Sequence, residues 1–344
     1  MKMVKRALAM LLIAAIALSF TACSDTTWAF EDNGQKYPAG VYLCQLLNAY
    51  STASSKVEDS SKNILKQEID GQSASDWIVQ EADRLVKEFL YVEREFANRQ
   101  LELTEDDKLS VQNQLAYQWQ YLESAYEKNG VAKSSLELVL TNTMKRQAIF
   151  KDIYGEGGAQ EVSEADLKTA FEEEYLKTRM ITFSKKSSSG SELTESELSE
   201  LETLARSYFD RAKNGEDMEK LIVERETELA EANDTELSHD HSEVTDHAGI
   251  LNYEDSTMTD EVKEKFQNAK NDEILYIDDE AYIIVAQKLD ILADSEDFDE
   301  YRDTVLNLLK GEEFDQMITE QIASLTPSYN SAALSRYTPK KLKL

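Results

Sequence analysis

All three histidines of the 344-residue chain fall in the stretch SHDHSEVTDH. His239, His241 and His247 alternate there with Asp240 and Asp246. A His-x-His pair with a third histidine nearby suits Zn²⁺, because imidazole and carboxylate are among the preferred ligands of this ion. Polar segments of this kind are also common in solvated loops that bind nothing. One hypothesis for the chain is therefore a metal- or solute-binding role carried by this loop.

A second residue that could take part in chemistry is Cys23, which follows a long apolar run. Lys2, Lys5 and Arg6 precede an uncharged stretch over residues 7–20. Fourteen residues are too few to span a bilayer comfortably, but they are typical of the apolar region of a secretory signal peptide. The sequence therefore predicts export.

The stretch Ser19-Phe20-Thr21-Ala22-Cys23 resembles a bacterial lipobox, in which the cysteine is diacylated and becomes the new N-terminus. Phe20 stands where leucine is usual. We expect a signal peptide over 1–22, lipidation of Cys23 and a polar tether over 23–36. The alternative is an ordinary signal peptide cut near Ala22, which leaves Cys23 free.

The composition excludes several classes of function. Removing the three cations of residues 1–22 from the 37 Lys and Arg leaves 34 against 67 Asp and Glu, a net charge of −33. So acidic a surface disfavours nucleic acid. No other apolar run approaches the ~18 residues of a transmembrane helix, so we expect membrane contact through lipid alone.

Cys44 lies among apolar neighbours and is predicted to be a buried, inert thiol. No nucleophile elbow or phosphate-binding loop is present.

The chain reads as helices, then mixed structure, then helices again. Only three prolines and eleven glycines favour long helices. Capping signals and apolar stripes predict helices from Trp77, over 104–130, over 134–154 and from Ser163. The first stripe is Ile78, Ala82, Leu85, Phe89, Val92 and Phe96. After residue 293 we expect two more helices, one with the stripe Phe298, Tyr301, Val305 and Leu308, and one over 312–325.

The middle of the chain has the order β-α-α-β-α-β-β. Alternation and turn residues predict these seven elements. They are a strand at 179–183, a helix over 194–213, a short helix around 218–222, a strand at 249–253, a helix over 259–269, and strands at 273–277 and 281–291. The acidic stretch 224–246 is expected to be an irregular loop. The fold class is thus α+β, with a mixed module inserted into a helical domain.

This order, behind a lipidated cysteine, resembles the PrsA/SurA group of extracytoplasmic foldases, whose inserted module is of parvulin type. Five stretches carry the resemblance: SEADLKTAFEEEY, ARSYFDRAKNGEDMEKLIVE, HAGILNY, MTDEVKEKFQNAKNDEI and EAYIIVAQKLD. The resemblance implies a helical chaperone-like domain over 37–175, a parvulin-like domain over 176–293, C-terminal helices over 294–326 that pack on the helical domain, and a tail over 327–344.

The resemblance also implies a prolyl-peptide pocket, altered at its centre. Met180 and Tyr282 stand where parvulins carry two histidines, and Tyr253, Met258 and Phe266 match the apolar part of the pocket. Prolyl isomerisation faces a barrier of roughly 18–20 kcal/mol. With the polar centre replaced, we expect weak or absent isomerase activity and a retained peptide-binding module. Simple core filling by Met180 and Tyr282 is the alternative.

Three functional hypotheses remain. The first is a lipid-anchored, extracytoplasmic foldase with some isomerase activity, and the second is a holdase of the same architecture without it. The third is a metal- or solute-binding surface lipoprotein that uses His239, His241 and His247. The first two imply unfolded or nascent exported polypeptides as partners and need no cofactor. A second copy of the chain is also kept as a candidate partner.

Overall fold

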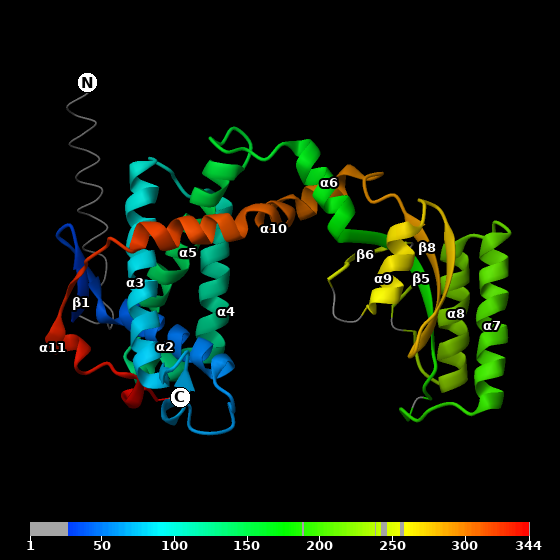
Figure 1. The fold of residues 1–344 in the computed structure, drawn as a ribbon, viewed down its shortest axis with the longest axis horizontal. Helices are drawn as coiled ribbons and strands as arrows, with labels where there is room; N and C mark the ends of the chain where they lie inside the picture. Colours follow the sequence, from blue (N-terminus) through cyan, green and yellow to red (C-terminus); the bar gives the residue numbers. More distant parts are fainter. Residues whose placement is uncertain (1–26, 188, 238, 242–245, 255–257, 344) are drawn as a thin grey trace. The chain divides into compact units, whose positions relative to one another are not determined.

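The computed structural model describes residues 27–187, 189–237, 239–241, 246–254 and 258–343, and its fold is α+β (Figure 1). Cys23 and the predicted signal peptide lie outside these residues. None of the described helices is long and apolar enough to cross a membrane. The chain divides into two compact units. We call Met1–Glu161 with Lys310–Leu344 the helical unit and Val162–Leu309 the sheet unit.

Four helices form most of the helical unit. They are α2 (Ala39–Lys56), α3 (Ala74–Asn98), α4 (Glu105–Asn129) and α5 (Lys133–Tyr154). The smaller elements are β1 (Trp28–Asp32), β2 (Gln35–Pro38), η1 (Ile64–Lys66), β3 (Glu68–Ile69), β4 (Gln72–Ser73), β9 (Ser328–Tyr329), α11 (Ser331–Leu334) and η2 (Pro339–Lys341). Local sequence sets the helix ends, since Thr104 and Asp107 form a complete capping box at α4.

The apolar stripe of α3 shows how the core of the helical unit is built. Ile78, Ala82, Phe89 and Val92 of the predicted stripe are all buried. They face α2 and α5, as 3.6-residue periodicity requires. Cys44 of α2 is buried in the same core as a free thiol, and burial raises its pKa to about 12. An inert thiol at this position agrees with the sequence prediction.

The predicted tether over 23–36 is wrong for its second half. Residues from Trp28 onward form strands β1 and β2, and Ala29 and Phe30 are fully buried. Asn33 and Gly34 both have positive φ, which is the requirement of a tight two-residue hairpin turn. The segment is polar on average, which suggested a tether. Its Asn-Gly turn and its apolar Trp28–Phe30 stretch nevertheless form a packed hairpin.

The C-terminal region is more ordered than the sequence suggests. Instead of two helices there is one, α10 (Ser295–Ile322), which runs through Gly311. A glycine inside a helix costs only about 1 kcal/mol relative to alanine. Phe314, Ile318 and Ile322 continue a buried four-residue repeat beyond it, which explains why the helix does not break.

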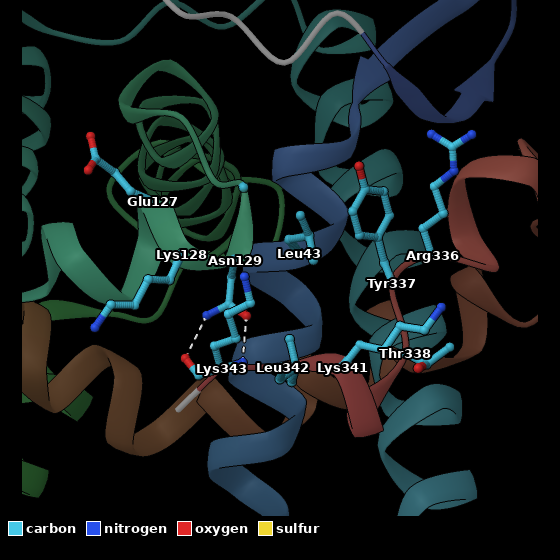
Figure 2. Close-up of a pocket in the computed structure, with 11 residues that line it drawn as sticks. Leu43, Glu127, Lys128, Asn129, Arg336, Tyr337, Thr338, Lys341, Leu342 and Lys343 are labelled. Carbon is cyan, nitrogen blue, oxygen red and sulfur yellow. Dashed lines mark hydrogen bonds between the residues drawn. The ribbon is translucent and has the colours of Figure 1, made fainter.

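The predicted tail over 327–344 also packs on the helical unit. Strand β9 pairs antiparallel with β1. Near its end, the backbone N–H of Lys343 donates to Oδ1 of Asn129 at 2.8 Å, and Nδ2 of Asn129 donates to the carbonyl of Lys343 at 2.9 Å (Figure 2). This reciprocal pair fixes the basic C-terminal segment beside the end of α4.

The sheet unit begins with α6 (Glu164–Glu174) and includes the first part of α10, to Leu309. Between them lie β5 (Tyr175–Ser184), α7 (Glu195–Lys213), α8 (Met218–Asn233), β6 (Gly249–Asn252), α9 (Asp260–Asn268), β7 (Ile274–Asp278) and β8 (Tyr282–Leu289). The four strands form an antiparallel sheet in the order β6-β5-β8-β7.

The two faces of this sheet are covered differently (Figure 1). Ile181 and Phe183 of β5, with Ile283 and Val285 of β8, pack against α7 and α8. The alternate residues of the same strands turn to the side that carries α9. We call the second side the α9 face.

The sheet unit is longer than the predicted 176–293 span. Phe171 of α6 and Tyr175 pack against Phe298 and Tyr301 of α10, with ring centroids 5.2–5.9 Å apart. Lys177 of β5 also forms an ion pair with Asp297. Helices α6 and α10, which precede and follow the sheet in the sequence, therefore pack on each other and on the start of β5.

The expectation of an irregular loop over 224–246 is wrong for its first ten residues. Helix α8 continues to Asn233 and ends at Asp234, which has left-handed backbone angles. Beyond Ile222 the sequence has no strong apolar stripe, so the spacing of its apolar residues did not predict a helix. Glutamate, alanine and arginine are good helix formers, and an Arg225–Glu228 ion pair spans one turn.

Candidate functional site

The α9 face is built by the pairing register of β5 and β8. Met180 lies opposite Ala286, Thr182 opposite Ile284, and Ser184 opposite Tyr282. Because directly paired residues share one side of a sheet, all six side chains belong to this face. The register therefore produces a row that changes from apolar to polar along β5.

The structure gathers four of the five predicted pocket residues in one apolar cluster. Tyr253 and Phe266 are buried in it, and Met180 and Met258 pack against it while remaining partly exposed. Tyr282 lies outside the cluster, with 46% of its surface exposed. Phe266 and Tyr253 are thus interior residues of the cluster, and only Met180, Met258 and Tyr282 have exposed surface.

Met180 and Tyr282 do not meet across the sheet. Their register partners are Ala286 and Ser184, respectively, so the two positions are four residues apart along the strands. At about 3.3 Å per residue this separates them by roughly 13 Å. The two side chains therefore do not form one paired centre in the way that the sequence resemblance implies.

The α9 face opens toward the start of β8. Leu176, Thr178 and Ala286 are buried at one end, whereas Thr182 and Tyr282 are exposed at the other. Met180 and Ile284 lie between these extremes. We call Met180, Thr182, Ser184, Tyr282 and Ile284 the open half of the face. Thr182, Ser184 and Ile284 were missed from the sequence, although strand alternation from Met180 and Tyr282 identifies them.

Lys288 ties the C-terminal end of helix α9 to this face. Nζ of Lys288 donates to the carbonyls of Phe266 at 2.9 Å and Ala269 at 3.0 Å, at the C-terminal end of the helix. A cation there also interacts favourably with the helix dipole. Burial lowers the pKa of Lys288. The lysine thus positions the α9 wall of the site.

The helical unit carries a separate apolar surface on α4. Leu109, Tyr117, Tyr121 and Leu122 are between 45% and 66% exposed. The rings of Tyr117 and Tyr121 lie against each other, with centroids 4.8 Å apart. Among the described residues, four of the ten large apolar side chains that are well exposed lie on this helix. We call these four residues the α4 surface.

The three histidines converge with a glutamate that the sequence did not single out. One ligand atom from each of Glu226, His239, His241 and His247 lies within 4.8 Å of the others. Nε2 of His241 is 2.8 Å from Oε2 of Glu226, and Nε2 of His239 is 2.7 Å from Nε2 of His247. We call these four residues the histidine cluster.

Glu219 orients the histidine cluster from the side. Its carboxylate accepts the backbone N–H of His247 at 2.9 Å and contacts Nδ1 of the same ring. Arg179 lies 3.6 Å from Glu219 and binds Asp246 through two hydrogen bonds of 2.8 and 2.9 Å. Glu219 and Glu226 are seven residues apart, which puts them on the same side of α8. Glu226 was hidden by the expectation that α8 ends early.

Two cavities lie away from these residues. The first, of about 340 Å³, lies in the helical unit between the end of α4 and the C-terminal segment (Figure 2). Lys128, Arg336, Lys341 and Lys343 make its lining basic. The second, of about 540 Å³, lies between α9 and β7. Neither is lined by a residue of the open half or of the histidine cluster.

Comparison with known proteins gives structural likeness alone. No protein-family model and no curated protein matches the chain. Foldase protein PrsA from Lactococcus lactis matches with 12% identity and a TM-score of 0.38, covering 92% of this chain and all of that chain. The PrsA structure from Streptococcus pneumoniae has 12% identity and a TM-score of 0.37, over 76% of this chain and 91% of that chain. PrsA from Bacillus subtilis has 14% identity and a TM-score of 0.31, over 77% and 93%. Likeness at these values does not establish an activity.

Proposed function

We propose that this protein is a folding factor that binds unfolded exported polypeptides. In this proposal the chain is held at the extracytoplasmic face of a cell membrane by lipid on Cys23. The strongest support comes from the open half of the α9 face, where Tyr282 is well exposed and Met180 and Ile284 are partly exposed. The order of the sequence motifs, which resembles that of extracytoplasmic foldases, supports the same role.

The chemistry of the open half suits weak binding of varied sequences. Methionine is flexible and polarisable, and tyrosine combines an apolar ring with a polar tip, so both adapt to different partners. Burial of apolar surface contributes about 25 cal/mol per Å², which permits transient capture and release. Ser184 and Thr182 add hydroxyl groups that can hydrogen-bond an extended backbone.

The α4 surface gives the helical unit a second place for a client to bind. Tyr117 and Tyr121 expose about two thirds of their surface, and α4 buries only Val111 and Leu115. Exposed apolar groups gathered on one helix commonly mark an interaction surface. We propose that an unfolded client covers these side chains, in addition to the open half of the α9 face.

Isomerase activity is proposed to be weak or absent. On the α9 face, the positions that the resemblance assigns to catalytic histidines hold Met180 and Tyr282, whose register partners are Ala286 and Ser184. Lys288, a titratable residue of the same face, is committed to the end of α9. The face can therefore hold a prolyl side chain, but it offers little polar chemistry to the peptide bond.

Suppression of aggregation tests this proposal. A chemically unfolded client protein is diluted into buffer with and without the protein, and light scattering is followed. We expect suppression at a few-fold molar excess. Refolding of a client limited by proline isomerisation is measured in parallel, and we expect no acceleration. Unchanged scattering at high excess would refute the folding role, and acceleration would refute only the loss of catalysis.

The α4 contribution is tested with a matched pair of variants. Tyr117→Ser combined with Tyr121→Ser removes two exposed rings and should reduce suppression. Val79→Ser removes an isolated apolar side chain of α3 that is 43% exposed, and it should leave suppression unchanged. Equal effects of the two variants would show that α4 has no special part in binding.

Lipid attachment has its own test. Mass spectrometry of the mature N-terminus from membranes should find a diacylglyceryl group on Cys23. An unmodified cysteine, or cleavage elsewhere, would contradict the anchor.

A further inference from the structure

We propose that the histidine cluster binds one Zn²⁺ ion, with His239, His241, His247 and Glu226 as the four ligands. This site is independent of the α9 face and of the folding role. It collects every histidine in the 344-residue chain. Three residues of one kind that come from a polar segment have no packing reason to meet at a point, whereas a shared ligand gives them one.

The distances between ligand atoms suit a small tetrahedral ion. With Zn–N and Zn–O bonds of 2.0–2.1 Å, tetrahedral ligands lie about 3.3 Å from one another. Oε2 of Glu226 lies 2.8 Å from Nε2 of His241, 3.5 Å from Nε2 of His239 and 3.6 Å from Nε2 of His247. Nε2 of His239 lies 2.7 Å from Nε2 of His247. These four separations lie within about 0.6 Å of the required value, and all the ligand atoms lie within 4.8 Å of one another, so side-chain movements alone can close the site around an ion.

The outer contacts of His247 prepare its ring for a metal. Glu219 accepts at Nδ1, which puts the ring proton on that nitrogen and leaves the lone pair of Nε2 directed at the cluster. A carboxylate behind a ligating histidine is the usual arrangement in zinc sites, where it fixes the tautomer and raises ligand basicity. Arg179 in turn lies beside Glu219, at 3.6 Å. Glu219 is therefore a positioning residue.

The ligand set indicates both the type of ion and the type of site. Three imidazoles with one carboxylate and no thiolate suit Zn²⁺ better than Mg²⁺ or Ca²⁺, which prefer oxygen ligands. Four protein ligands complete a tetrahedron and leave no position for a reactive water, so the site is structural rather than catalytic. The ligand side chains are 12–34% exposed, which gives an ion access from solvent.

A bound ion would tie the segment before β6 to helix α8. Glu226 belongs to α8, and His247 lies two residues before Gly249, the first residue of β6. Strand β6 is an edge of the sheet and pairs with β5 through Gly249 and Thr178. Metal binding should therefore stabilise the sheet unit.

Calorimetric titration of the purified, chelator-stripped protein with ZnCl₂ tests the site. We expect one ion per chain. Removing one ligand with His241→Ala should weaken binding by more than about 100-fold, beyond the usual cost of losing an outer-shell partner. Co²⁺ serves as a spectroscopic probe, and we expect the intense visible bands of tetrahedral coordination. The melting temperature should rise with Zn²⁺ for the native protein and not for His241→Ala.

The matched control is Glu231→Gln, which removes an exposed carboxylate of α8 outside the cluster. It should leave the titration unchanged. Equal weakening by Glu231→Gln and His241→Ala would mean that Zn²⁺ is held by the general acidity of the chain, and this would overturn the proposal. Absence of binding heat and of a Co²⁺ spectrum in the native protein would overturn it without reference to any variant.

Discussion

The α9 face and the histidine cluster are two regions of one small sheet unit, and they are built in opposite ways. The α9 face keeps apolar walls but has Met180 and Tyr282 where the resemblance places polar chemistry. The histidine cluster gathers polar ligand atoms within 4.8 Å of one another beside α8. The apolar surface suited to binding thus lies on the α9 face, whereas the polar groups suited to chemistry lie in the histidine cluster.

The difference teaches that the strongest chemical signal does not mark the proposed main function. A face that binds varied polypeptides needs accessible, adaptable side chains rather than reactive ones. A metal site needs fixed donors and a supporting outer contact, which Glu219 supplies for His247. Three substitutions separate the two regions experimentally, and a fourth test examines the α9 face directly.

The largest effect is expected from Phe266→Ala. The ring is 1% exposed in the cluster that joins α9 to the sheet, so its loss should cost about 3–5 kcal/mol of unfolding free energy. Urea unfolding measures this cost. Labelling of Cys44 serves as a control, because its raised pKa should keep the native thiol unreactive while the helical unit remains folded. A stable variant that loses only client binding would place Phe266 in the binding surface instead.

An intermediate effect is expected from Glu219→Gln. An amide keeps the shape of the side chain but weakens the contact with Nδ1 of His247, so affinity for Zn²⁺ should fall about 10- to 100-fold. Client binding should not change, because Glu219 belongs to the opposite side of the sheet. Calorimetry measures the first quantity and aggregation suppression the second. A parallel loss of both would show that the two regions are coupled.

The smallest effect on stability is expected from Tyr282→Ala. The side chain is 46% exposed and lies outside the apolar cluster, so unfolding free energy should change by less than about 0.5 kcal/mol. Affinity for an unfolded, proline-containing peptide should fall about fivefold to tenfold, or roughly 1–1.4 kcal/mol. Fluorescence anisotropy of a labelled peptide measures it. Unchanged affinity would remove Tyr282 from the binding surface.

Local sequence signals predicted the parts of the fold that depend on local physics. The α+β class, the stripe of α3 and the capping box of α4 follow from periodicity and cap chemistry. Helix α8 beyond Ile222 and the unbroken α10 were missed. The later part of α8 has helix-forming residues but no apolar stripe to reveal it. In α10, Gly311 looks like a helix end in the sequence but is tolerated inside the helix.

The sites were predictable only in part, because contacts between distant residues set them. The spacing of His239, His241 and His247 left metal binding open as one hypothesis, but Glu226 lies beside them only because α8 is long enough to reach them. Similarly, alternation put Met180 and Tyr282 on strands, but only the pairing register shows that they lie four residues apart. Register depends on the whole sheet and cannot be derived from either strand alone.

Site-specific photo-cross-linking tests the central claim most directly, namely that the open half of the α9 face binds unfolded polypeptide. A photoreactive phenylalanine analogue is placed at Tyr282, and in a separate protein at Glu231 as an exposed reference. Both are illuminated with an unfolded, proline-containing client. We predict strong cross-links from position 282 that excess unlabelled peptide abolishes, and few from position 231. Equal or absent cross-linking at position 282 would contradict the proposed function.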